Sequence, residues 1–434
     1  MKKIIFLFCL IINGLSAQKL TLSEAIKTGL ENNIALKTQG LQVQLTTSEN
    51  EKLKAKWLPQ VTAAADARVN TQLQTSILPF DITGKNPGKS SQVRFGLPYS
   101  NTLGLQADQK IFDANKKIDK QLYNMQGDVQ NNLLEQQKSA VRQNITEAYY
   151  AAIYNKERIA LAEKTIIRAE QNLENAGVKL KNGTLLQNDF DRYQLDVKNA
   201  SITLKKAKLD LNNSLENLKF RMNVKTEAEL DVAEDLASIL KISDLLPTQN
   251  IDQRAEIKGE ELALKLNGMN QDKQRFRNYP TVSAYGNYTV LQQINTPDIF
   301  QSGSLFPFNY VGIRVSMPVF DGKQGKIIAN EFALKQEINR LNIERLRNDF
   351  SFDSQNALRQ MEQAKLAMTE TKQNIELAQQ ILKTDLFRYE KGTLGFAEVK
   401  NSEASLQNAE TNYLANVYSL LVATIAYKRA VGGF

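Results

Sequence analysis

The sequence predicts a mixed membrane protein, in which long α-helices form a coiled-coil barrel and four short strands per chain contribute to a transmembrane β-barrel. Long segments carry apolar residues at heptad spacing, which is typical of coiled-coil helices. Four short segments instead alternate apolar and polar residues, as strands with one apolar face do. Two of them, Leu103–Asp113 and Val311–Asp321, end in Ile-Phe-Asp and Val-Phe-Asp, 208 positions apart. The chain is therefore predicted to be an internal two-fold repeat.

Residues 1–17 have the pattern of a secretory signal peptide. Lys2 and Lys3 precede an apolar run that ends at Ile12, and small residues lead to a predicted cleavage site after Ala17. The run is about half of the ~20 residues that a spanning helix needs, and no later run approaches that length. Cys9 lies inside the run, badly placed for lipoprotein processing, so we do not expect a lipoprotein.

The mature chain lacks the residues that many active sites and metal sites use. It has no histidine, and its only cysteine lies in the predicted signal peptide. This composition excludes histidine general bases, Ser-His-Asp triads, disulfides and cysteine metal sites. The formal net charge of +8 comes from interspersed Lys and Arg without a basic block, which argues against nucleic acid as a partner. We predict no catalytic residues, no cofactor and no metal.

The first repeat is predicted at residues 18–223. Thr21 and Glu24 have the spacing of a capping box at the start of its first helix, which should stop before Pro59. In the long helix, eleven of the twelve heptad positions from Val141 to Leu180 are apolar. At 1.5 Å per residue, about 70 residues would extend roughly 105 Å, too long for a compact domain. The predicted elements are a helix to about residue 57, strands at about 60–70 and 99–112, a long helix at 113–182 and a returning helix at 184–223.

The second repeat, residues 251–434, is predicted to follow an irregular connector at 224–250, which loses the heptad. Its helix-to-strand joint Asn278–Pro280 corresponds to Trp57–Pro59 in the first repeat. The predicted elements are a helix from about residue 251, strands at about 281–291 and 309–320, a long helix at 322–391 and a returning helix at 393–431.

The strands have the length of tilted transmembrane strands, which need about nine to eleven residues. Four strands cannot close a barrel, and open edges cannot lie in hydrocarbon, so several copies must combine their strands. Aromatic residues beside the strand ends, among them Phe306, Phe308 and Tyr310, suit an interfacial girdle. We expect lipid to meet Leu103, Leu105, Ile111, Val311, Ile313 and Val315, and a lumen to be lined by Arg68, Asp108, Lys110 and Arg314.

The chain resembles the TolC-like outer membrane factor family, the exit ducts of bacterial efflux pumps and type I secretion systems. The resemblance covers essentially the whole mature chain. It rests on LTLSEAIKTGLENN at 20–33, the WLP and NYP joints, the IFD and VFD strand ends, and the turns KNGTLLQND and RYEKGTLGFAEV.

The resemblance implies a homotrimer with a twelve-stranded barrel in the outer membrane and an α-helical tunnel in the periplasm. It also implies passive export of small molecules or proteins through a tripartite pump. The implied partners are further copies of the chain, outer membrane lipid, a periplasmic adaptor (membrane fusion protein) and an inner-membrane transporter of the RND, ABC or MFS type.

Two turns resemble the periplasmic tips of that family, where the adaptor docks and the resting channel closes. The first contains Gly183, Thr184 and Leu185, and the second contains Gly392, Thr393 and Leu394. For the gate, Asp189 and Tyr389 match an aspartate and a tyrosine that the family pairs, while Leu394 replaces the arginine of that group. Glu398 and Asn401 match two lumen aspartates of the family, which leaves a weaker acidic ring.

Two other classes of protein are weighed against a channel. An enzyme would rest only on carboxylate pairs such as Asp189 with Asp191, without a nucleophile, base or phosphate loop beside them. A periplasmic adaptor or secreted coiled-coil scaffold without channel activity would share the hairpins and heptads. An adaptor should continue into a lipoyl-like domain and a run of barrel strands, whereas this chain has four isolated strands in two matched pairs. The sequence therefore favours a channel.

Overall fold

The structure is a computed structural model that describes residues 18–80, 90–225, 229–243, 250–298 and 305–434. The predicted signal peptide lies outside these residues. The described chain forms two compact units. The helical unit contains the described residues up to Gln42 with Val129–Glu261 and Asn339–Phe434, and the strand unit contains Val43–Asp128 and Leu262–Ile338.

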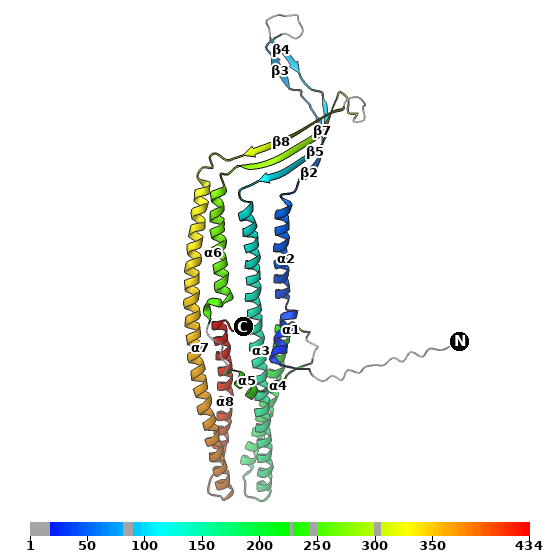
Figure 1. The fold of residues 1–434 in the computed structure, drawn as a ribbon. Helices are drawn as coiled ribbons and strands as arrows, with labels where there is room; N and C mark the ends of the chain where they lie inside the picture. The colour runs from blue at the N-terminus through cyan, green and yellow to red at the C-terminus, as the bar shows by residue number, and fades with distance from the viewer. Residues whose placement is uncertain (1–17, 81–89, 226–228, 244–249, 299–304) are drawn as a thin grey trace, which may run out of the picture. The chain divides into compact units, whose positions relative to one another are not determined.

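Two helical hairpins provide most of the helical unit (Figure 1). They are formed by α3 (Lys116–Lys181) with α4 (Gln187–Met222), and by α7 (Gln324–Glu390) with α8 (Phe396–Val431). The heptad positions Ile145, Ala148 and Ala152 of α3 are at most 3% exposed and belong to the main hydrophobic core. Small alanines at the seam allow the helices to approach closely. No helix in the described part of the chain has both the length and the apolar character needed to cross a membrane.

The opening helix is divided into α1 (Leu22–Asn32) and α2 (Ile34–Ala55). The predicted capping box is confirmed, since the Glu24 N–H donates to Thr21 Oγ1 and the Thr21 N–H donates to Glu24 Oε2. The division falls at Asn33, which has extended backbone angles and accepts the Leu36 N–H through its side-chain oxygen at 3.1 Å. Asn33 thus ends one helix and caps the next, in agreement with the preference of asparagine for N-cap positions.

The connector after α4 is more regular than the sequence predicts. It contains β6 (Leu230–Val232), which pairs in parallel with β1 (Gln18–Leu20), and then α5 (Leu236–Ser243). The short 3-10 helix η1 (Ile251–Gln253) follows it, where the sequence predicts the start of a longer helix. Strands of three residues carry no measurable alternation. They form here because pairing joins segments that are more than 200 positions apart, and a local sequence pattern does not contain this information.

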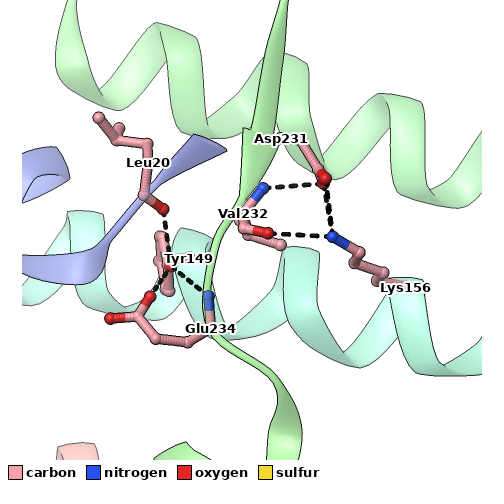
Figure 2. A network of polar contacts seen from close by, with 6 residues as sticks. All are labelled: Leu20, Tyr149, Lys156, Asp231, Val232 and Glu234. Carbon is pink, nitrogen blue, oxygen red and sulfur yellow. Dashed lines mark hydrogen bonds and ion pairs between the residues drawn. The ribbon is translucent and has the colours of Figure 1, made fainter. Parts of the chain in front are cut away.

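Polar contacts fasten this small sheet to α3, as Figure 2 shows. The buried Tyr149 hydroxyl is shared between the Leu20 carbonyl oxygen, at 2.8 Å, and the Glu234 carboxylate. Glu234 also accepts the Leu22 N–H at 3.1 Å. Lys156 Nζ lies 2.8 Å from Asp231 and 3.0 Å from the Val232 carbonyl oxygen. These contacts satisfy backbone groups of β1 and α1 that would otherwise lack partners.

The strand unit contains one four-stranded antiparallel sheet in the order β2-β5-β7-β8 (Figure 1). Its members are β2 (Gln60–Val69), β5 (Tyr99–Phe112), β7 (Thr281–Ile294) and β8 (Leu305–Ser316). β2 and β8 are the edges of this sheet. Each repeat thus contributes two neighbouring strands, and the two pairs meet where β5 pairs with β7.

Two further parts of the strand unit complete the fold. The segment predicted as a long polar loop contains a hairpin of β3 (Thr75–Leu78) and β4 (Ser91–Arg94). The second repeat opens with α6 (Ala255–Lys273), whose end is followed by the short 3-10 helix η2 (Gln274–Phe276) before β7 begins. Ion pairs Lys273–Asp119 (2.6 Å) and Arg277–Asp321 (3.3 Å) link this region to the starts of the long helices.

Candidate functional site

One face of the four-stranded sheet is aliphatic. The register places Leu103 beside Ala65 and Val290, and Leu105 beside Ala63 and Tyr288. In β8, Val311, Ile313 and Val315 lie on the same face, and they are 91%, 70% and 65% exposed. Exposed aliphatic side chains in a continuous patch are rare on soluble surfaces and mark an interaction surface.

A β-bulge changes the alternation near the end of β5. Lys110 pairs with Ser283, but Phe112 pairs with Val282, the next residue along β7. Ile111 is therefore the extra residue of the bulge. Phe112, not Ile111, lies in register with Val282 on the aliphatic face.

The opposite face of the sheet carries the charged residues. Asp108 pairs with Tyr285, and Lys110 pairs with Ser283, which in turn pairs with Arg314. Arg68 lies on the same face through its partner Ser100. The register thus places on one face the four charged residues that the sequence predicts there: Arg68, Asp108, Lys110 and Arg314. Arg68 lies at the opposite end of the sheet from Asp108 and Lys110.

Aromatic residues of β8 also lie on this charged face. The pairing of β7 with β8 is continuous, so Phe306, Phe308 and Tyr310 share the parity of Arg314 rather than that of Val311. These three residues therefore lie on the face opposite Val311 and Ile313. Their proximity to strand ends suggests a girdle, and the unbroken alternation of β8 fixes the face that they occupy.

The ring of Tyr285 covers Gly312 on the same face. A Cβ at Gly312 would come within 2.8 Å of the Tyr285 ring, so any larger residue there would have to displace the ring. The ring also meets Tyr310 edge-on at 6.0 Å between centroids, and Arg314 lies 4.7 Å from its centroid. The charged face thus carries an aromatic strip along β8.

The two predicted tip turns have the same backbone geometry. Gly183 and Gly392 have φ of +69° and +72°, in the left-handed region. In both turns the glycine N–H and the following threonine N–H bond to carbonyls of the last helical turn, which is a Schellman motif. A Cβ at either glycine would meet nothing within 4 Å, so backbone angle rather than space requires glycine. Both glycines and both threonines are exposed, while Leu185 and Leu394 are half-buried.

The predicted gate pair is not formed as in the family pattern. The Asp189 carboxylate contacts Arg192, one turn along α4, at 3.8 Å. The Tyr389 ring instead lies 4.0 Å from Lys179 Nζ, and its hydroxyl lies near Tyr193. Burial raises the pKa of Tyr389, and the nearby Asp189 charge raises it further.

The other two predicted gate residues lie at the start of α8. Glu398 is exposed in the first turn, and its carboxylate lies against the N-cap residue Gly395. An acidic side chain at this end of a helix interacts favourably with the helix dipole. Asn401 is exposed one turn further along the helix.

No protein-family model matches the sequence, and no curated protein matches it as a relative. Solved structures match nearly the whole chain at low sequence identity. A crystal structure of CusC has a TM-score of 0.75 and 16% identity over 94% of this chain and 91% of that chain. The open-state outer membrane channel MtrE of Neisseria gonorrhoeae has 0.69 and 18%, over 95% and 88%. The outer membrane channel CmeC of Campylobacter jejuni has 0.68 and 15%, over 95% and 85%.

The chain has the TolC-like fold. This confirms the predicted fold class of long paired helices joined to a four-stranded antiparallel sheet. Chains at such low identity can share a fold while their site residues differ, so the polar contacts of this chain have to be taken from its own structure.

Within this TolC-like fold, a polar network joins the two hairpins of the helical unit. Lys400 Nζ on α8 lies 2.6 Å from Asp196 on α4 and 2.5 Å from Glu403. It also lies 4.8 Å from the centroid of Tyr193. Further from the two tip turns, Arg168 on α3 pairs with Glu410 on α8 at 3.0 Å.

The sequence does not distinguish Lys400, Glu403 and Arg168 from other charged helix residues. Charged residues on a long helix usually face solvent, and nothing in their spacing distinguishes inter-hairpin partners from solvated ones. Tyr193, by contrast, could be predicted as a buried residue, because it occupies a heptad position of the sequence. In the structure its side chain is 7% exposed. Among the described residues, no cluster of three or more His, Cys, Asp or Glu is arranged to hold a metal ion.

Proposed function

We propose that the protein is an outer membrane channel that three copies form together. The observation that carries the proposal is the four-stranded sheet, with an exposed aliphatic face, a charged face and two edge strands. Lipid would cover the aliphatic face, and the charged face would line a water-filled lumen. Three copies would close a twelve-stranded barrel by pairing β8 of one copy with β2 of the next, which satisfies the edge groups that hydrocarbon cannot.

Exposed heptad stripes on the helices support self-assembly. Leu195, Ile202 and Leu209 of α4 follow one another at intervals of seven and are 56%, 64% and 65% exposed. Apolar residues at this spacing belong in the seam between two coiled-coil helices. Since the described residues of one chain leave them exposed, we assign their partners to neighbouring copies.

The helical unit would then form a periplasmic tunnel. In this proposal the tip turns Gly183–Leu185 and Gly392–Leu394 meet a periplasmic adaptor, which connects the channel to an inner-membrane transporter of the RND, ABC or MFS type. The channel itself moves small molecules or proteins passively, as part of an efflux pump or a type I secretion system. MtrE and CmeC, which share the fold, are described as outer membrane channels.

The resting closure would depend on the contacts of this chain's own residues. The Lys400–Asp196 pair joins α8 to α4 near the tip, and Tyr389 of α7 lies near Tyr193 of α4. We propose that these contacts serve the closing function that the family assigns to an arginine at the position of Leu394. Asp189, Glu398 and Asn401 would lie around the same opening.

Single-channel conductance in a planar bilayer tests the proposal, with the mass of the detergent-purified oligomer measured in parallel. Trimers that give discrete openings, or that insert and open only with an adaptor, support it. A monomer that remains in solution without detergent and never conducts would contradict it. That result would favour a secreted coiled-coil scaffold, whose aliphatic sheet face would have to be buried in a soluble assembly.

A further inference from the structure

A pocket of about 550 Å³ lies in the strand unit between the end of α2 and the start of α3. Lys54, Trp57, Lys116 and Lys120 line it, together with Glu51 and neutral residues. Lys116 Nζ lies 3.9 Å from the centroid of the Trp57 ring. The pocket therefore combines an aromatic ring with three ammonium groups.

The three lysines lack acidic partners among the described residues. Nearby carboxylates bind other cations, since Asp113 pairs with Lys110 at 3.0 Å and Asp119 pairs with Lys273 at 2.6 Å. Glu51 is the one acidic residue that lines the pocket within the described chain. The pocket consequently has excess positive charge, which favours an anionic occupant.

The internal repeat provides a comparison for this pocket. At the equivalent joint, Asn278 replaces Trp57, Gln324 replaces Lys116 and Ile328 replaces Lys120. Arg277 spans that joint, pairing with Asp321 at 3.3 Å and donating to Gln324 at 2.5 Å. The fold therefore builds a helix-to-strand joint without Trp57, Lys116 and Lys120, while Arg275 keeps a basic residue at the position of Lys54. The fold alone does not require Trp57, Lys116 or Lys120 at the first joint.

The position of the pocket points to its occupant. Trp57 lies three residues before β2, and Lys116 lies four residues after β5. If the sheet spans the outer membrane, as the proposed function requires, this joint lies at the headgroups of the periplasmic leaflet. Tryptophan and basic residues are the side chains that contact lipid at such an interface.

We propose that this Trp57 pocket binds the phosphate headgroup of an anionic phospholipid in the periplasmic leaflet. The lysines hold the phosphate, and the indole ring lies at the boundary with the acyl chains. Bound lipid thereby anchors the first joint of each copy at a fixed depth in the membrane.

Trp57 is the only tryptophan in the chain, so its fluorescence reports on the pocket directly. The full-length mature protein is reconstituted in bilayers of phosphatidylglycerol and phosphatidylcholine at one fixed composition. The quenching bromine label is placed on the acyl chains of either one lipid or the other. We expect stronger quenching per labelled lipid when phosphatidylglycerol carries the label.

The double variant Lys116→Gln with Lys120→Gln should remove most of this preference, because each lysine near an anionic surface favours anionic lipid by about fivefold. The matched control, Lys323→Gln with Lys326→Gln at the second joint, should retain it. Oligomer mass and circular dichroism establish that both variants fold, and phospholipid that co-purifies with each variant is measured as a second readout.

Equal quenching by the two labels, or a preference that survives the Lys116 and Lys120 changes, would overturn lipid selection while leaving the channel proposal intact. Loss of the preference on adding inorganic phosphate would identify a free-phosphate site instead. Absence of quenching by either label would mean that the joint is covered by protein or lies outside the bilayer, which overturns the lipid site. Conductance of the same sample then decides whether the channel proposal also fails.

Discussion

Lys400 on α8 lies 2.6 Å from Asp196 on α4, and this contact joins the two helical hairpins close to their turns. The Lys400 side chain is 24% exposed, so water screens the pair less than it would a surface pair. Tyr193 and Glu403 complete the surroundings of the ammonium group. The contact is thus placed where separation of the hairpins would break it.

Replacing Lys400 by methionine should loosen the closed state. The change keeps most of the apolar stem but removes the charge that holds Asp196 and Glu403, leaving these two carboxylates to repel each other. We expect more frequent openings in planar bilayers, with unchanged oligomer mass. Lys198→Met, at an exposed position of α4, is the control. Identical opening frequencies for the two variants would show that Lys400 does not hold the closed state.

Charging the aliphatic sheet face should prevent membrane assembly. Leu105→Lys places an ammonium group among exposed aliphatic residues, which costs about 2–4 kcal/mol per copy at the bilayer midplane. Gln106→Lys, the next residue, places the same group on the charged face and should assemble normally. Recovery of trimer in the outer membrane fraction measures both. Equal recovery of the two variants would contradict the assignment of the faces.

Replacing Gly392 by valine should strain the second tip turn. The left-handed φ of +72° costs a β-branched residue about 1–3 kcal/mol. We expect weaker adaptor binding and weaker efflux, while trimer mass remains unchanged because the change is confined to an exposed turn. Gly40→Ala, in a helix where a Cβ meets nothing within 4 Å, is the control. Loss of the trimer in Gly392→Val would count against a role restricted to docking.

Alkaline pH should weaken the contact between Tyr193 and Tyr389. Burial, together with nearby Tyr389 and Glu403, raises the pKa of Tyr193 above its ordinary value of 10.0. Because the folded-state pKa of Tyr193 lies above its unfolded-state value, the protonated hydroxyl contributes its full stabilisation below pH 10. This contribution is lost as the pH rises from there through the folded-state pKa. The melting temperature should therefore fall between pH 9 and 11 by more in the native protein than in Tyr193→Phe. An equal fall in melting temperature in both proteins would show that ionisation of Tyr193 does not cause the loss of stability.

Removing the Tyr149 hydroxyl should release β1. Tyr149→Phe leaves the buried Leu20 carbonyl and the half-buried Glu234 carboxylate without this partner, at a cost of about 1–3 kcal/mol. Faster hydrogen exchange in residues 18–32 measures the effect. Tyr150→Phe, at a neighbouring position that is 2% exposed, should change exchange little. Similar protection in both variants would show that β1 is held by other contacts.

The sequence by itself determined the fold class, because that information is local and repeated. Heptads from Val141 to Leu180 specify a long helix with one apolar seam, and alternation around Leu103 and Val311 specifies strands with two unlike faces. The capping box of Thr21 and Glu24 is equally local. Each of these signals depends on spacing within a few turns of one element.

Only the tertiary structure decided the features that depend on distant partners. The β1–β6 pair, the pairing of β5 with β7, and the contact of Lys400 with Asp196 all arise from segments far apart in the chain. The same holds for the pocket around Trp57, where the end of α2 meets the start of α3. A charged or aromatic residue has the same local pattern whether it faces solvent or a partner. Its role was fixed only when folding brought that partner within contact distance.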